Sequence, residues 1–125
     1  MSTTCTNTVS SDGKYIIHKI VGEIDARIAS ELNHDLVEMG RRYNINRYLT
    51  DLTECRNVDS LVDNYNYAYR DLPADPVIDP SARVALLVSP EDHSHDFVEV
   101  TCRNAGFDVT LFRERDAAVR HLLNE

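Results

Sequence analysis

Short apolar runs alternate with longer amphipathic segments along most of the chain, and this alternation constrains the fold more than any other feature. The clearest run is RVALLV, Arg83 to Val88, which is typical of a strand covered on both faces of a sheet. Amphipathic segments between such runs are typical of helices that connect parallel strands by right-handed crossovers. The alternation therefore predicts an open α/β fold with a mostly parallel sheet.

The first part of the chain adds a hairpin to this pattern. Asp12-Gly13 is a strong signal for a two-residue turn, because glycine readily takes the positive φ that such turns require. We expect an edge strand over about residues 4–10 and a buried strand over about residues 15–21. One antiparallel strand therefore precedes the parallel ones.

Four helices are expected from apolar side chains at helical spacing. The first begins after Asp25 as N-cap and ends at Arg41 and Arg42, whose positive charge suits the end of a helix dipole. Its inward stripe consists of Ile28, Leu32, Leu36, Met39 and Tyr43. A short buried strand, Arg47 to Leu52, follows this helix.

The second helix is expected to run up to Pro73, because the residue before a proline is biased away from helix. Its inward stripe consists of Leu61, Tyr65, Ala68 and Leu72. This register turns Tyr65 inward, with Tyr69 on the flank of the stripe, and leaves Tyr67 facing outward. An exposed tyrosine is suited to a protein interface, because its ring buries a large area at small entropic cost.

The third helix is predicted to start at Ser89 as N-cap with Pro90 at its first position, and Gly106 is expected to end it. A strand, FDVTLF, and a last helix, RDAAVRHLL, complete the chain. The predicted order is β-β-α-β-α-β-α-β-α. We expect one domain over residues 1–125, in which residues 1–3 at the start are disordered.

Composition and charge exclude several classes of function. The net charge of −8 repels phosphate backbones, so a nucleic-acid partner is disfavoured. No stretch approaches the roughly 20 apolar residues that cross a bilayer. Three cysteines without a C-x-x-C pair and a start without a signal peptide are typical of a reducing compartment, so a cytoplasmic location is expected.

With this order in hand, DLTECRNVDS (Asp51 to Ser60) resembles the STAS family, which includes the bacterial anti-sigma-factor antagonists. In that family a strand ending in a polar-Leu pair is followed six residues later by Asp-Ser-Ser-Gly at the start of a helix, and Asp51-Leu52 precedes Asp59-Ser60 by that spacing. The closing segment DVTLFRERDAAVRHLL also resembles the end of STAS domains, a last strand followed by an Ala-containing helix. The RVALLV strand resembles an uncharacterised branch of the STAS superfamily that is also compared with lipid-binding CRAL-TRIO domains. The resemblance implies a regulatory, non-enzymatic domain that binds another protein.

The sequence departs from the family at the regulatory position. The second serine, which carries the phosphate in the family, is Leu61 here, and the glycine is Val62. Phosphoserine switching is therefore not implied for this chain. Ser60 itself is interpreted as the helix N-cap in a Ser60-x-x-Asp63 variant of the capping box, with phosphorylation of Ser60 as the alternative.

Other candidate sites are weaker. His93 and His95 would point about 200° apart on a helix, so they are not expected to bind one metal ion together. Cys55, beside Arg56, is the better nucleophile candidate than Cys102 on its apolar stripe, but no base lies near it in the sequence. No catalytic group, metal or cofactor is therefore assigned.

Two functions remain. The first is binding of another protein through the turn Cys55 to Ser60 and the outward face of the next helix; the residues assigned to this surface are Arg56, Asn57, Asp59, Ser60, Asn64, Tyr67 and Asp71. The alternative is binding of a small apolar or lipid-like ligand in a cleft beside the helix of Tyr65 and Tyr69. The loop Pro73 to Pro80 and the strand RVALLV would cover that cleft.

Overall fold

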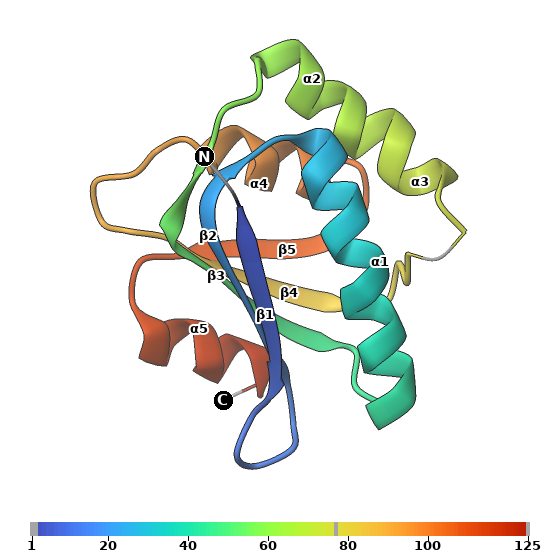
Figure 1. The fold of residues 1–125 in the computed structure, drawn as a ribbon, viewed down its shortest axis with the longest axis vertical. Helices are drawn as coiled ribbons and strands as arrows, with labels where there is room; N and C mark the ends of the chain where they lie inside the picture. Colours follow the sequence, from blue (N-terminus) through green and yellow to red (C-terminus); the bar gives the residue numbers. More distant parts are fainter. Residues whose placement is uncertain (1–2, 77, 125) are drawn as a thin grey trace.

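The computed structural model describes residues 3–76 and 78–124, which form one five-stranded sheet with helices on both faces (Figure 1). The strands lie side by side in chain order: β1 (Thr4–Val9), β2 (Ile16–Ile24), β3 (Arg47–Asn57), β4 (Arg83–Leu87) and β5 (Asp108–Phe112). β1 pairs antiparallel with β2, and all other pairs are parallel. The predicted mixed, mostly parallel sheet with an antiparallel edge strand is confirmed.

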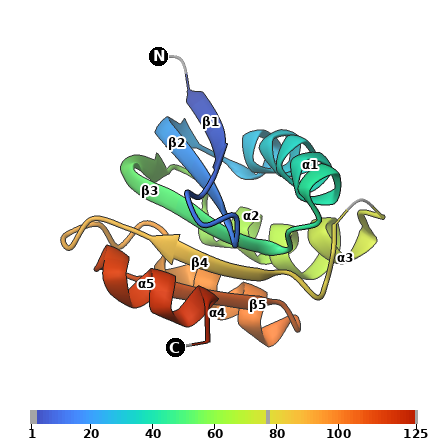
Figure 2. The ribbon, with the colours of Figure 1, turned by 90° about the horizontal axis from the view of Figure 1, so that it is seen from below.

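The helices are divided unequally between the two faces (Figure 2). They are α1 (Ala26–Tyr43), α2 (Leu61–Asn66), the π-helical segment η1 (Tyr67–Asp71), α3 (Leu72–Ala74), α4 (Asp96–Asn104) and α5 (Arg115–Leu122). α5 packs alone on one face, whereas α1 and α4 pack on the other. α2, η1 and α3 continue one another, and α2 and η1 pack mainly against α4. None of the described helices is long and apolar enough to span a bilayer.

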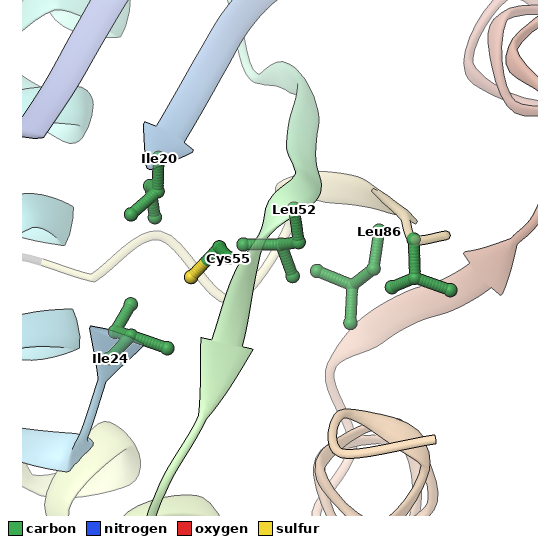
Figure 3. Close-up of a cluster of buried hydrophobic side chains, with 6 residues drawn as sticks. Ile20, Ile24, Leu52, Cys55 and Leu86 are labelled. Atoms are coloured by element: carbon green, nitrogen blue, oxygen red, sulfur yellow. The ribbon is translucent and has the colours of Figure 1, made fainter. Parts of the chain in front are cut away.

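β4 explains why RVALLV is apolar throughout. Its Leu86 faces α1 and α4 in a cluster that also contains Ile20, Ile24, Leu52, Cys55 and Val88 (Figure 3). Ala85 and Leu87, on the opposite face, pack against α5. Both faces of this strand are therefore buried, as the apolar run predicted.

The hairpin turn is longer than the sequence suggested. The Ser10 N–H donates to the Tyr15 carbonyl oxygen at 2.9 Å, so four residues separate the last bonded pair instead of two. Gly13 has the expected positive φ of 73°. The oxygen atoms of the Ser10 and Asp12 side chains both accept from the Lys14 N–H, at 3.2 and 3.0 Å, and these bonds stabilise the wider loop.

The first helix has the predicted ends. The Asp25 carboxylate accepts from the Ile28 N–H at 2.9 Å, and Arg41 and Arg42 lie in the last turn. Tyr43, however, is 52% exposed, so its assignment to the inward stripe is wrong. The helix ends there at Asn44, which has a left-handed backbone conformation.

The third long helix starts later than predicted. Residues from Ser89 to Ser94 form turns, and α4 begins at Asp96. The Ser89 hydroxyl donates to the Thr53 carbonyl oxygen at 2.7 Å instead of capping a helix. Gly106, with φ of 100°, follows the end of the helix as expected. The expectation of disorder at residues 1–3 falls on residues 1 and 2, which lie outside the described residues, and on Thr3, whose hydroxyl donates to the Glu23 carbonyl oxygen.

Candidate functional site

The predicted turn after β3 is shorter than expected, because the strand continues to Asn57. Cys55, Arg56 and Asn57 are therefore strand residues, and the placement of Cys55 to Asn57 in a turn is wrong. The chain turns over residues 58–60, where the Val58 N–H donates to the Ile24 carbonyl oxygen at 3.0 Å. This turn lies at the carboxyl ends of β2 and β3, an edge where ligand sites of open α/β sheets are found.

Ser60 is the N-cap of α2, as predicted. Its backbone is extended, and its hydroxyl accepts from the Asp63 N–H at 3.1 Å. Asp59, just before it, accepts from the Ala26 N–H through Oδ2 at 2.6 Å and donates its own N–H to Asn57 Oδ1 at 3.0 Å. Ser60 is exposed to solvent, whereas Asp59 is half-buried between two helix starts.

The helix after the turn departs from the predicted register, although Ala68 is buried as predicted. Tyr67 and Asn64, expected to face outward, are 8% and 5% exposed. The Tyr67 hydroxyl accepts from Asn33 Nδ2 of α1 at 2.5 Å, and Asn64 Oδ1 accepts from Asn57 Nδ2 at 3.0 Å. Burial raises the pKa of Tyr67 well above its usual value, so the hydroxyl stays neutral.

The tyrosines expected to pack inward are the exposed ones. Tyr65 is 52% exposed, Tyr69 is 37% exposed, and Val62 on the same face is 67% exposed. The rings of Tyr65 and Tyr69 contact each other, with centroids 4.5 Å apart. We call Val62, Tyr65 and Tyr69 the α2 apolar face.

Polar hydrogen bonds account for this reversal. Asn64 and Tyr67 are three positions apart, and each has a partner inside the fold, on β3 and α1. The wider π-helical turn that begins at Tyr67 then shifts the following residues relative to a regular α-helix. A stripe defined by hydrophobicity alone cannot include residues that are buried because they are hydrogen-bonded.

The seven residues assigned to a partner surface do not form one patch. Asn57, Asp59, Ser60 and Asn64 lie close together at the turn, and only Ser60 among them is exposed. Arg56 is exposed on β3, and Asp71 is exposed at the far end of η1, beside Arg70 at 3.7 Å. Tyr67 is buried and leaves the surface.

Neither cysteine near the site is activated. Burial raises the pKa of the Cys55 thiol to about 12, and the neighbouring Arg56 does not reverse this effect. Burial also raises the pKa of Cys102 to about 12. Both thiols are therefore protonated and behave as small apolar side chains.

His93 and His95 do not lie on a helix together, so the predicted geometry is wrong, although they still have separate partners. His95 is buried, with Nε2 at 2.9 Å from the Cys55 carbonyl oxygen. His93 Nδ1 lies 2.8 Å from Asp96 Oδ2. No group of three or more His, Cys, Asp or Glu side chains arranged for a metal ion occurs in residues 3–76 and 78–124.

A cavity of about 180 Å³ lies between the sheet and the η1–α3 segment. Leu72 and Ile78 contribute to one wall and Val84 and Leu86 to the other. These residues belong to the loop and strand that the ligand alternative named, but the tyrosine in the wall is Tyr67, not Tyr65 or Tyr69.

His18 and Thr50, which are not among the predicted site residues, also line the cavity. A signal for His18 exists: it stands between Ile16 and Ile20, at the alternate positions of a strand that point to one face. Thr50 carries no comparable signal, because the apolar content of RYLTDL predicts only a buried strand.

Comparison with known proteins identifies solved structures that share the fold of this chain. No protein-family model matches the sequence, and no curated protein sequence matches it either. An anti-sigma factor antagonist from Mycobacterium paratuberculosis has a similar structure, with a TM-score of 0.59 and 11% identity over 98% of this chain and 95% of that one. An uncharacterised protein of the DUF3478 family from Shewanella loihica, described as having a SpoIIAA-like fold, gives a TM-score of 0.51 and 19% identity over 96% of this chain and 93% of that one. The chain therefore has the SpoIIAA-like fold that its resemblance to STAS domains implied.

Proposed function

We propose that this protein is a regulatory module that binds another protein through the α2 apolar face. The observation that carries the proposal is the exposure of Val62, Tyr65 and Tyr69 on one side of a short helix, directly after the exposed cap Ser60. Tyrosines exposed in this way are typical of interface anchors. The similar fold of an anti-sigma factor antagonist, a protein that acts on another protein, supports the same class of function.

The charges around the α2 apolar face define the chemistry of the partner. Asp63 and Asp71 are exposed on the same helical segment, with Arg70 as its one exposed cation among the described residues. The whole chain carries a net charge of −8. The complementary surface is therefore apolar at its centre and basic at its rim, because charge complementarity steers association and excludes wrong partners.

The proposal assigns the protein no catalytic step and places it in the cytoplasm. Both buried thiols near the site are protonated at neutral pH because burial raises the pKa of each one. The described polar residues of the turn are occupied by hydrogen bonds to the backbone or to one another. These observations favour a structural role for the turn, which holds the docking helix in place.

The test is a quantitative affinity capture from extract of the native cell, followed by titration of the purified partner. Tyr65→Ala with Tyr69→Ala removes both aromatic anchors and should weaken partner binding at least tenfold. Ser60→Asp keeps an N-cap and adds a charge at the edge of the surface. We expect it to weaken a partner that approaches residue 60 without unfolding α2.

Tyr43→Ala is the matched control, because Tyr43 is also 52% exposed but lies at the end of α1. A partner that is retained by wild type and Tyr43→Ala and lost from the double tyrosine variant supports the proposal. Equal retention of the same proteins by all variants would show that the α2 apolar face is not the docking surface.

A further inference from the structure

The volume of the cavity beneath η1 and α3 limits the size of the molecule that it can hold. Its volume is about 180 Å³, and its walls include Ile20, Leu52, Val84 and Leu86 from the sheet. A cavity of about 150 Å³ lined by Leu, Ile and Phe is known to hold benzene. The space therefore matches one substituted aromatic ring and is too small for a diacyl lipid.

His18 is one of the polar residues that line the cavity. The side chain is buried, with a residue exposure of 2%, and Nδ1 lies 2.6 Å from Asn7 Oδ1. A carboxamide oxygen only accepts, so Nδ1 carries the proton and Nε2 is left as an acceptor. Within residues 3–76 and 78–124, no side-chain or backbone group hydrogen-bonds to Nε2.

Thr50 adds a hydroxyl beside this acceptor. His18 and Thr50 are direct neighbours in the pairing of β2 with β3, and both line the cavity. Thr50 is 8% exposed, and its hydroxyl has no hydrogen-bond partner among the described parts of the chain. Neither atom is fully enclosed by protein, since His121 Nε2 is the only enclosed side-chain nitrogen or oxygen without a partner among the described residues. Both groups are therefore accessible to a molecule in the cavity.

The charges that line the cavity exclude an anionic occupant. Asp25, Asp59 and Asp79 are among its lining residues, whereas no lysine or arginine of the described residues is. A carboxylate or phosphate would be repelled and would lose its hydration without a compensating cation. A neutral molecule is not repelled by these carboxylates and does not lose the hydration of a charge.

We propose that the cavity binds a neutral aromatic molecule of one ring that carries a hydroxyl group. The hydroxyl donates to His18 Nε2 and accepts from the Thr50 hydroxyl, while the ring contacts Leu52, Val84 and Leu86. This is a small-molecule site inside the fold, and it goes beyond the docking of a protein on the outer side of α2. It does not depend on that docking.

The test uses p-cresol and toluene, which differ by one hydroxyl, as probes in NMR titrations of the isotope-labelled protein. We expect both to shift the resonances of Ile20, Leu52 and Leu86, and p-cresol to bind at least as tightly as toluene. Burying a hydroxyl without a partner costs a few kcal/mol, so a cavity that offered none would prefer toluene. Thr50→Val and His18→Phe should each lower the preference for p-cresol over toluene about tenfold.

Two further variants test whether the probes bind in the cavity and whether this binding is independent of the α2 apolar face. Ala29→Leu places extra atoms in the cavity wall and should abolish binding of both probes in a protein that keeps its circular dichroism spectrum. Tyr65→Ala with Tyr69→Ala should bind p-cresol like the wild type, because those side chains lie outside. The proposal is overturned if neither probe shifts the cavity resonances at millimolar concentration. It is also overturned if the preference for p-cresol is unchanged in both Thr50→Val and His18→Phe.

Discussion

Asp59 Oδ2 accepts the Ala26 N–H at 2.6 Å, so the residue before the cap of α2 also holds the first turn of α1. The first N–H groups of a helix have no partner within it, and a carboxylate there is also favoured by the helix dipole. Asp25 caps the same turn through the Ile28 N–H. One short turn thus secures the starts of two helices.

Replacing Asp59 should therefore loosen α1 as well as the turn. We expect Asp59→Ala to lower the free energy of unfolding by about 1–2 kcal/mol, similar to the loss of an N-cap. Asp59→Asn keeps an acceptor oxygen and should cost less. Urea unfolding measures the stability, and hydrogen exchange at Ala26 reports the bond; unchanged exchange in Asp59→Ala would contradict the assignment.

The two tyrosines that differ most from the predicted register provide a matched pair. Tyr67→Phe removes the acceptor of the Asn33 amide in a buried position and should cost about 1 kcal/mol. Tyr65→Phe alters an exposed ring and should change stability by less than about 0.5 kcal/mol. Equal effects of the two variants in chemical denaturation would argue against the buried position of Tyr67.

Acid should destabilise the protein through His18. Burial lowers the pKa of His18 from 6.5 to about 4, so between these values the unfolded chain binds more protons there than the folded protein. This contribution to stability is fully present above about pH 6.5 and is lost as the pH falls towards 4. The total is about 3 kcal/mol, since one pKa unit corresponds to about 1.4 kcal/mol.

The measurement is urea unfolding at pH 4, 5 and 7, with His18→Leu as the comparison. The variant lacks the titrating group, so its stability should fall less steeply between pH 7 and 4 than that of the wild type. Parallel curves for the two proteins would show that His18 is not the buried, neutral group described above.

Gly40 should not tolerate a methyl group although it lies inside α1. A Cβ at this position would lie 2.6 Å from the Ile45 carbonyl oxygen and would also overlap the Tyr48 hydroxyl. Alanine favours helix by about 1 kcal/mol over glycine, but this overlap outweighs the gain. We expect Gly40→Ala to lose about 1–3 kcal/mol, and to lose less in a Tyr48→Phe background, as a thermal double-mutant cycle can measure.

The sequence contains the information for the sheet because the relevant signals are local. The apolar run of β4, the cap Asp25 and the cap Ser60 each depend on neighbouring residues, and each is confirmed. The cap predicted at Ser89 fails for a tertiary reason, because that hydroxyl bonds to the carbonyl oxygen of Thr53 on β3. A local motif cannot show that a distant strand end competes for the same group.

The candidate sites were less predictable than the fold. The outward position of Tyr65 follows from hydrogen bonds that bury Asn64 and Tyr67, and their partners Asn57 and Asn33 come from other elements. The cavity is a volume left between several elements, and no single segment encodes it. His18 was visible only as a polar residue on an apolar strand face, a signal that does not by itself distinguish a ligand contact from a core histidine.

The segment from α2 through η1 to α3 packs mainly against α4, and this has a thermodynamic consequence. Tyr67 on its inner side lines the cavity, while Tyr65 and Tyr69 on its outer side are exposed. A molecule in the cavity and a protein bound to the α2 apolar face would thus contact opposite sides of the same helical segment. If binding of one ligand changes the position of this segment and so alters the affinity for the other, linkage requires the second ligand to alter the affinity for the first by the same factor.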